Sequence, residues 1–567
     1  MPSGEWYLGI DIGATHLSAT LLDKQTEQQY PLYWVDRRKS TNQESYKLSL
    51  EVDWLEKSIN GSGITPGLLH RFKPYLNVTI PFISPQNQQW EPRIRQSETQ
   101  TVPLIHIQEA LVALLSTLHP ASPSPLQSQA KGLSSDMLRL AMTQLSGVIV
   151  NQPVGSSDAY RFNLREVILK AGFVTDPARI FFLEEAIAAL LPELHTATDS
   201  DFSTGAILVV SAGTSATELA LTTLTNGLQA VSRSNIYLRR VPYAGNALDQ
   251  DVICQLLLPT AKGWESLHLQ TLNLPLPGEP DLEARYQLQQ RLDSVPLGQQ
   301  LLAAVRQIKP LLCQQDTTLE WEGNRWQLRH QDFKSWIMAP YLQQLNREVN
   351  SLLSQLGLSA DRVETVICTG GSLAIGTIAQ WLQYKFPKAT LIHDSDSHRA
   401  SHDDIEPSRH QRIASGLALL PLFPAVLDSV RHQYSEYYLL RIILKTLSVQ
   451  TEHLISSAHL QSLLEKQHVP ANACQPFVTN LLEGQLPPGL VITKASAMLL
   501  SSESIHSSDY QELAAASLFS RQGNQVYRVS RQQRDRLWNH LQIILANTHQ
   551  TLEQPLAVTL ADVNKQV

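Results

Sequence analysis

The segment Tyr7–Asp23, YLGIDIGATHLSATLLD, constrains the fold more than any other part of the chain. It predicts an apolar strand, a tight turn and a second alternating strand. Gly13 has no Cβ and Ala14 a small side chain, so the turn can bring backbone N–H groups close to an anion, and Thr15 adds a hydroxyl donor. Asp11 ends the first strand, where a carboxylate can hold a hydrated Mg²⁺ against phosphate oxygens. The same residues also fit an ordinary β-hairpin whose turn happens to contain Asp and Gly.

A second strand–turn–strand segment lies 200 residues further on, at Ile207–Leu224, ILVVSAGTSATELALTTL. In this alignment Ser211 falls opposite Asp11, and Gly213 falls opposite Gly13. Two such hairpins in sequential halves favour two lobes of similar fold, about 1–200 and 201–424. We expect a cleft between them in which both turns, including Thr214 and Ser215, face one ligand.

Composition excludes several classes of protein. The net charge of −7 among 567 residues argues against a nucleic-acid-binding surface. No apolar run is long enough to span a bilayer, and the first residues do not resemble a secretory signal. The four cysteines are far apart and form no CxxC pair, which argues against zinc and against a disulfide framework. We therefore expect a cytoplasmic protein.

Other segments predict the elements around these hairpins. Tyr75–Ile83 alternates like a strand, and the Pro- and Ser-rich stretch His119–Ser135 predicts a loop. Asp158–Ala171 is an amphipathic helix that Gly172 should close. Gln411–Leu420, with its small residues, predicts a helix suited to close packing.

A diglycine follows the apolar strand predicted at Val363–Thr369. Gly370, Gly371 and Ser372 lie between this strand and a predicted helix, where backbone can approach a ligand and the helix dipole favours anions. The same glycines would also serve a close strand–helix contact.

Residues 425–567 differ from the preceding residues in sequence pattern, with several apolar-rich helical segments, and predict a separate, mostly helical C-terminal domain. The expected helices and the one expected strand are Tyr437–Leu447, Leu454–Lys466, Leu513–Phe519, Arg536–Leu552 and the strand Gln525–Val529.

The order of these motifs over about residues 5–422 resembles the nucleotide-binding domain of the heat-shock-70 (DnaK-like) chaperones, within the actin, hexokinase and chaperone ATPase superfamily. The resemblance implies an α/β fold: a two-lobed actin-like ATPase domain with duplicated mixed sheets flanked by helices. It also implies ATP and Mg²⁺ as cofactors. GIDIGATHLSATLLD resembles the first phosphate loop and VVSAGTSATELAL the second. VICTGGSLAIGTIAQWL resembles the adenosine motif.

The resemblance also assigns roles to single residues. FFLEEAIAALL matches the segment of the catalytic glutamate and gives that role to Glu184, beside Asp11. VPYAGNALDQDVICQLL resembles another nucleotide-site stretch, with Gly245 retained and Asp249 as a weaker metal-side carboxylate. Lys309 stands where the family has a basic residue near adenosine.

Departures from the family pattern affect the expected chemistry. Ser211 replaces the second loop's aspartate, and this loop keeps only one of three glycines. Glu218 stands where it could replace a later aspartate, and Lys73 only loosely matches a catalytic lysine. Glu185 replaces a proline used in interdomain signalling. The C-terminal region is too short for both the family's peptide-binding β-sandwich and its helical lid.

Three hypotheses follow for function. The first, which we favour, is a divergent chaperone-family ATP-binding protein whose lobes close with nucleotide and whose C-terminal domain binds a protein client or partner; the sequence leaves slow hydrolysis open. The second is a non-hydrolysing scaffold that uses the helical C-terminal domain for protein–protein interaction. The third is a small-molecule kinase of the same superfamily, for which the sequence offers no convincing base.

Overall fold

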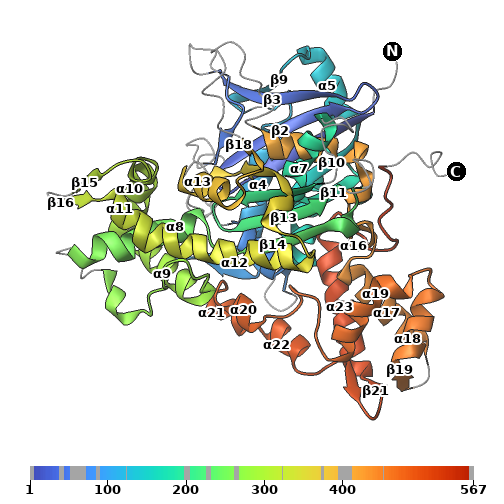
Figure 1. Ribbon diagram of the computed structural model, residues 1–567. Coiled ribbons are helices and arrows are strands. Elements are labelled where there is room, and N and C mark those ends of the chain that lie inside the picture. The colour runs from blue at the N-terminus through green and yellow to red at the C-terminus, as the bar shows by residue number, and fades with distance from the viewer. Residues whose placement is uncertain are drawn as a thin grey trace.

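The computed structural model is an α/β structure in which two mixed sheets are flanked by helices (Figure 1). It describes residues 5–37, 44–50, 72–84, 90–122, 124–196, 205–224, 231–260, 267–321, 324–371, 376–393, 411–450 and 453–560.

The first sheet contains the N-terminal hairpin at its centre. Its strands follow the order β11-β10-β1-β2-β3-β9, and the short β4 pairs with β2. The hairpin strands β1 and β2 are antiparallel, whereas β10 is parallel to β1 and β11 is parallel to β10. The strands are β1 (Trp6–Ile12), β2 (His16–Asp23), β3 (Gln28–Asp36), β4 (Leu48–Ser49), β9 (Leu126–Ala130), β10 (Leu145–Gln152) and β11 (Ile180–Glu184).

The second sheet repeats the order and directions of five adjacent strands of the first, β11-β10-β1-β2-β3. Its order is β14-β13-β12-β17-β18, again with an antiparallel hairpin next to two parallel strands. Even the local irregularity recurs, because the register shifts between Trp6 and Tyr7 in one sheet and between Ala206 and Ile207 in the other. The strands are β12 (Ala206–Ala212), β13 (Thr217–Thr223), β14 (Ile236–Val241), β17 (Val363–Thr369) and β18 (Thr390–His393). The predicted repeat of strand, turn and strand is therefore confirmed.

Helices α7 (Glu185–Thr196) and α15 (Arg412–Leu419) contribute to one hydrophobic core with both sheets. This core includes Tyr7 from the first sheet and Val209 from the second. The close packing predicted for α15 is confirmed, because a Cβ on Gly416 would lie 1.7 Å from the Ala188 carbonyl oxygen of α7.

Further helices and short strands complete this part of the chain. Helix α6 has the predicted bounds, and Gly172 ends it with φ 80°. The elements are α4 (Leu104–Ser116), α5 (Ser135–Thr143), α6 (Asp158–Ala171), α8 (Gly245–Val252), α9 (Leu282–Ser294), α10 (Pro296–Leu312), α11 (His330–Asp332), α12 (Ala339–Gln355), α13 (Gly376–Lys385), β5 (Phe82–Ile83), β6 (Trp90–Glu91), β7 (Arg93–Arg95), β8 (Thr101–Pro103), β15 (Thr317–Trp321) and β16 (Asn324–Leu328), with π-helical segments η4 (Ile253–Leu257) and η8 (Phe333–Met338).

Two sequence predictions in this part are wrong. Tyr75–Ile83 is mostly not a strand, because α3 (Phe72–Val78) buries Phe72, Tyr75 and Leu76 at helical spacing against its neighbours. The stretch His119–Ser135 is not only a loop, because Leu126–Ala130 pairs with β3 as strand β9 and buries alternate residues. In both cases tertiary packing decided between local alternatives.

The C-terminal region is mostly helical and includes a small sheet of order β19-β21-β20. The helix predicted from Leu454 begins only at Ser457, because Leu454–Ser456 forms β19 and the Ser456 side chain caps the helix. The helix predicted at Leu513–Phe519 ends at Ala514, and Phe519 belongs to β20. The elements are α16 (Ser429–Gln433), α17 (Glu436–Val449), α18 (Ser457–Glu465), α19 (Ala471–Leu482), α20 (Lys494–Ala497), α21 (Ser502–Ile505), α22 (Ser508–Ala514), α23 (Arg531–Ala546), β19 (Leu454–Ser456), β20 (Phe519–Arg521) and β21 (Val526–Val529).

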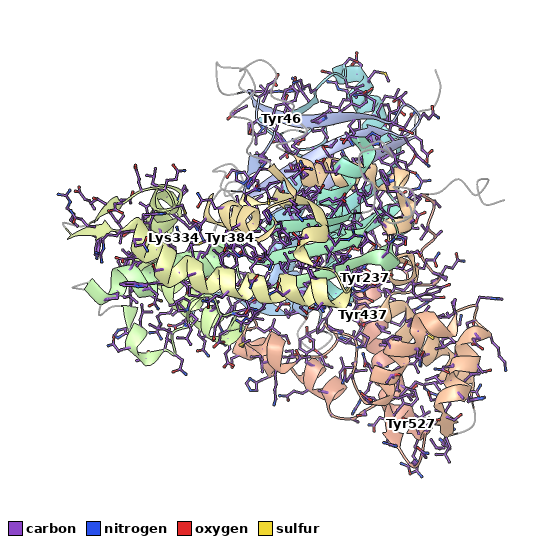
Figure 2. All side chains as sticks on the ribbon, viewed as in Figure 1. Tyr46, Tyr237, Lys334, Tyr384, Tyr437 and Tyr527 are labelled. Carbon is purple, nitrogen blue, oxygen red and sulfur yellow. The ribbon has the colours of Figure 1, made fainter. Side chains whose placement is uncertain are left out.

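The core of the C-terminal region also contains residues from the N-terminal half. Ile80, Phe82 and Phe162 pack into it, and the Phe162 ring lies 5.5 Å from that of Tyr437. Figure 2 labels Tyr437. This region therefore docks on α6 and β5 through a shared apolar core. Over the ranges described above, no helix has the length and hydropathy needed to cross a bilayer.

Candidate functional site

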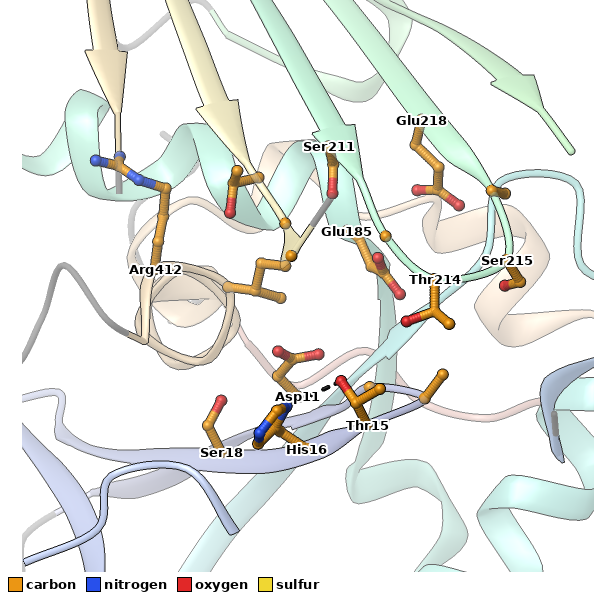
Figure 3. A pocket seen from close by; sticks show the side chains of 18 of the residues that line it. Asp11, Thr15, His16, Ser18, Glu185, Ser211, Thr214, Ser215, Glu218 and Arg412 are labelled. Carbon is orange, nitrogen blue, oxygen red and sulfur yellow. Dashed lines mark hydrogen bonds between the residues drawn. The ribbon is translucent and has the colours of Figure 1, made fainter. Parts of the chain in front are cut away.

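A cavity of about 430 Å³ lies between the two hairpin turns (Figure 3). The structure brings together here nine of the residues that the sequence predicts as metal-side or phosphate-binding residues, although they come from segments far apart in the chain. They are Asp11, Gly13, Ala14, Thr15, Gly213, Thr214, Ser215, Gly370 and Gly371. The two turns have the same backbone bond: Gly13 N–H donates to His16 O over 2.9 Å, and Gly213 N–H donates to Ala216 O over 3.1 Å.

Asn151, at the end of β10, organises the first wall of the cavity. Its buried Oδ1 accepts from Ile12 N–H at 2.9 Å. Its Nδ2 donates to Asp11 Oδ1 at 2.9 Å and to Glu185 Oε1 at 3.0 Å. Sequence reasoning missed this residue; the available signal was an amide side chain directly after the apolar run Val148–Val150 of a buried strand.

Glu185, rather than Glu184, lines the cavity. Glu185 Oε1 forms an ion pair with Lys73 Nζ, and both side chains are largely buried. Glu184 is the last residue of β11, and its carboxylate lies 3.6 Å from Arg233 Nη2 instead. Because adjacent side chains leave a strand end in opposite directions, only one of the two glutamates can face the cavity, and sequence order could not say which one.

The second hairpin carries its carboxylate on the other strand. In the first hairpin Asp11 pairs in register with Ser18, whereas in the second Ser211 pairs with Glu218. The acid and the serine have thus exchanged strands. Glu218 Oε1 accepts from the backbone N–H of Val154, in the first half of the chain, at 2.7 Å.

Two buried oxygen atoms in the second hairpin have no hydrogen-bond partner within the part of the chain that the structure describes. They are Ser211 Oγ and Glu218 Oε2, and both residues line the cavity. Buried polar atoms are usually satisfied, so these two are suited to contacts with a polar ligand.

The charges around the cavity favour an anionic ligand. Burial, reinforced by repulsion from Glu185, raises the pKa of Asp11 to about 7, although Lys73 and Lys47 oppose this shift. Burial likewise raises the pKa of Glu218 to about 8, with Glu185 again adding to the effect. Four cationic side chains line the same space: Lys47, Lys73, Arg240 and Arg412. These four cations outnumber the three described lining carboxyls, Asp11, Glu185 and Glu218, so the lining carries excess positive charge even when all three are ionised.

The diglycine meets the second hairpin at the cavity edge. Gly370 has φ 102°, and a Cβ there would lie 2.4 Å from the Ala212 carbonyl oxygen, so glycine is required. Among the described residues, no atom lies within 4 Å of a Cβ placed on Gly371. Gly370 thus serves a close backbone contact, whereas Gly371 makes no such contact within the described part of the chain. Ser372 lies outside the described residues.

Gly245, Asp249 and Lys309 lie together behind the second turn and do not line the cavity. Gly245 N–H donates to Gly213 O at 3.3 Å, and Lys309 Nζ donates to Asp249 Oδ1 at 2.5 Å and to Gly245 O at 3.1 Å. The carboxylate of Asp249 also lies 3.5 Å from Arg306 Nε. An aspartate paired with two cations is poorly placed to hold a metal, so this group supports the turn.

The described residues contain no cluster of three or more His, Cys, Asp or Glu side chains arranged to hold a metal ion. A Mg²⁺ ion that arrives with phosphate groups needs only one or two protein carboxylates. Asp11 is such a carboxylate at the cavity wall.

Neither a scan against protein-family models nor a search of the curated proteins finds a match to the chain.

Proposed function

We propose that the chain binds ATP with Mg²⁺ in the cavity between its two hairpin turns, as a divergent member of the heat-shock-70 family with slow hydrolysis. The observation that carries this proposal is the pair of equivalent turns, Gly13–Thr15 and Gly213–Ser215, that line one cationic cavity. Backbone N–H groups and hydroxyls converging from two sides are suited to a polyphosphate. The five-strand order that the two sheets share supports a two-lobed actin-like arrangement as part of the same proposal.

The residues of the first wall have distinct parts in this proposal. Asp11 would hold Mg²⁺ through water, and the ion would neutralise charge on the phosphates. Lys73, which is ion-paired with Glu185, adds positive charge at the same wall. Glu185 is the candidate to orient the attacking water and accept its proton, with Asn151 keeping its carboxylate in place.

The second wall supports slow turnover. Ser211 occupies the position equivalent to Asp11, so the metal side lacks a carboxylate there. The bond from Val154 N–H to Glu218 joins the two halves directly across the cavity. Ligand-dependent closure of the halves would act on this bond, and α6, which follows Val154, packs against the C-terminal region. A protein client or partner bound by that region, and a cytoplasmic location, belong to the same proposal.

A non-hydrolysing scaffold is the second candidate function. Ser211 favours it, because a hydroxyl cannot replace the charge of a carboxylate at the metal. In that case the chain would bind nucleotide weakly or not at all and act through its C-terminal region.

Calorimetric titration of the full chain with ATP and Mg²⁺ tests binding, and single-turnover hydrolysis tests the chemistry. Asp11→Asn should weaken Mg²⁺-dependent binding. Glu185→Gln should slow hydrolysis by roughly 10²–10⁴-fold, the usual range for a positioned base. Glu184→Gln is the matched control and should leave the rate nearly unchanged. No detectable ATP binding would overturn the proposal, and binding without turnover would favour the scaffold.

A further inference from the structure

A second cavity, of about 730 Å³, shares no described lining residue with the cavity between the hairpin turns. One wall consists of the consecutive residues Arg325–Arg329, on and just after β16, and the other includes Gln255, Leu256 and Pro259. Strands β15 and β16 lie at the end of the molecule opposite the C-terminal helices (Figure 1), near Lys334 of η8 (Figure 2). We call this space the β16 groove.

The β16 groove follows a strand edge. Strand β16 pairs with β15 from Thr317↔Leu328 to Trp321↔Asn324, and no other strand joins it in the described part of the chain. Consecutive residues of β16 and no described residue of β15 line the groove, so it runs along the edge of β16 that faces away from β15. An open strand edge can bind an extended peptide through main-chain hydrogen bonds.

The walls beside this edge have features typical of binding sites. Gln255 and Leu256 belong to the π-helical segment η4, and Trp336 belongs to the π-helical segment η8. Such segments are rare and are found frequently at functional sites. Trp336 is 50% exposed, and a tryptophan in a groove is the kind of side chain that dominates binding energy at interfaces.

The charge along β16 indicates the chemistry of the partner. Arg325, Gln327 and Arg329 are exposed, whereas Trp326 and Leu328 point into the core. The two arginines are four residues apart, which is roughly 13 Å along a strand. Arg325 lies 3.3 Å from Glu320 and Arg329 lies 2.8 Å from Asp332. Both arginines are mostly exposed, so these ion pairs are weak. Among the described lining residues the two arginines outnumber the one carboxylate, Asp332, so the groove favours an acidic partner.

We propose that the β16 groove binds an extended, acidic peptide segment of a partner protein. The segment adds as a strand to the open edge of β16. Acidic side chains four residues apart face Arg325 and Arg329, and an apolar side chain packs on Trp336. This inference goes beyond nucleotide binding and does not depend on it.

Fluorescence polarisation of the full chain with a labelled peptide, Ser-Val-Glu-Val-Ser-Val-Glu-Val, tests the proposal. The same peptide with both glutamates changed to lysine should bind at least tenfold more weakly. Trp336→Ala and the double variant Arg325→Glu with Arg329→Glu should each weaken binding of the acidic peptide at least tenfold. Arg139→Glu, an exposed arginine in α5, is the matched control and should leave the affinity unchanged.

The double variant offers a further check that does not depend on loss of binding. It should bind the lysine peptide better than the wild type does, because the charges are then complementary again. Equal binding of both peptides by the wild type, or unchanged affinity in Trp336→Ala and in the double variant, would overturn the proposal. ATP affinity measured on the same samples should not change, which separates this result from the fate of the nucleotide proposal.

Discussion

Replacing Asn151 with alanine would remove the side chain that joins Asp11, Glu185 and the backbone of Ile12. The buried Ile12 N–H would lose Asn151 Oδ1 as its acceptor, and an unsatisfied buried donor costs about 1–3 kcal/mol. The carboxylates of Asp11 and Glu185 face the cavity, where water can replace part of the hydrogen bonding that they lose with Asn151. We therefore expect the free energy of unfolding to fall by about 2–4 kcal/mol without ligand.

The loss should be larger in the presence of nucleotide. A ligand at 100 times its dissociation constant stabilises the folded state by about 2.7 kcal/mol. If the misplaced Asp11 carboxylate lowers Mg²⁺–ATP affinity tenfold, about 1.4 kcal/mol of this gain disappears. The assay is thermal or denaturant unfolding of wild type and variant, each with and without Mg²⁺ and ATP.

Asn163→Ala is the matched control for this experiment. Asn163 is also fully buried and bonds Gln108 and the backbone of Leu76, but it lies away from the cavity. It should cost similar stability and keep the full ligand-induced gain. Equal ligand-induced gains in both variants would refute a positioning role for Asn151, and an unchanged stability without ligand would refute the argument from the buried N–H.

Three further predictions concern the fold. Gly416→Ala should destabilise the chain by about 3 kcal/mol or more, because the added methyl overlaps the Ala188 carbonyl, whereas Gly523→Ala, which has open space, should not; thermal unfolding decides. Burial lowers the pKa of His540 to about 4, so the unfolded state binds more protons between pH 4 and 6.5, and the free energy of unfolding falls as pH falls through that window. His540→Phe should recover up to about 3 kcal/mol of this free energy at pH 4. An equal loss of stability with falling pH in wild type and variant would contradict this. Truncation after residue 424 should expose Phe82 and Phe162 and give an aggregating protein, and an unchanged unfolding midpoint would show that the shared core is not required.

Much of the architecture was predictable from local sequence patterns. The hairpin at Tyr7–Asp23 and its copy 200 residues later each have strand-like alternation of side chains around a glycine turn. Few structures other than a β-hairpin fit this pattern. Helix α6 was predictable to the residue because Gly172 ends it with a left-handed conformation. Segments with weaker local preferences, such as α3 and β9, took the structure that their neighbours imposed.

The residues of the candidate site also fall into two groups: those that local sequence patterns predict and those that only the tertiary structure brings together. The sequence by itself determined the two turns and the diglycine, because glycines and a strand-end carboxylate specify local backbone geometry. Only the tertiary structure decided that Glu185 and not Glu184 reaches the cavity, that Asn151 joins Glu185 to Asp11, and that Glu218 bonds across to Val154. These contacts join strands and loops tens to more than a hundred residues apart, and their partners depend on strand direction and register, which local patterns do not encode.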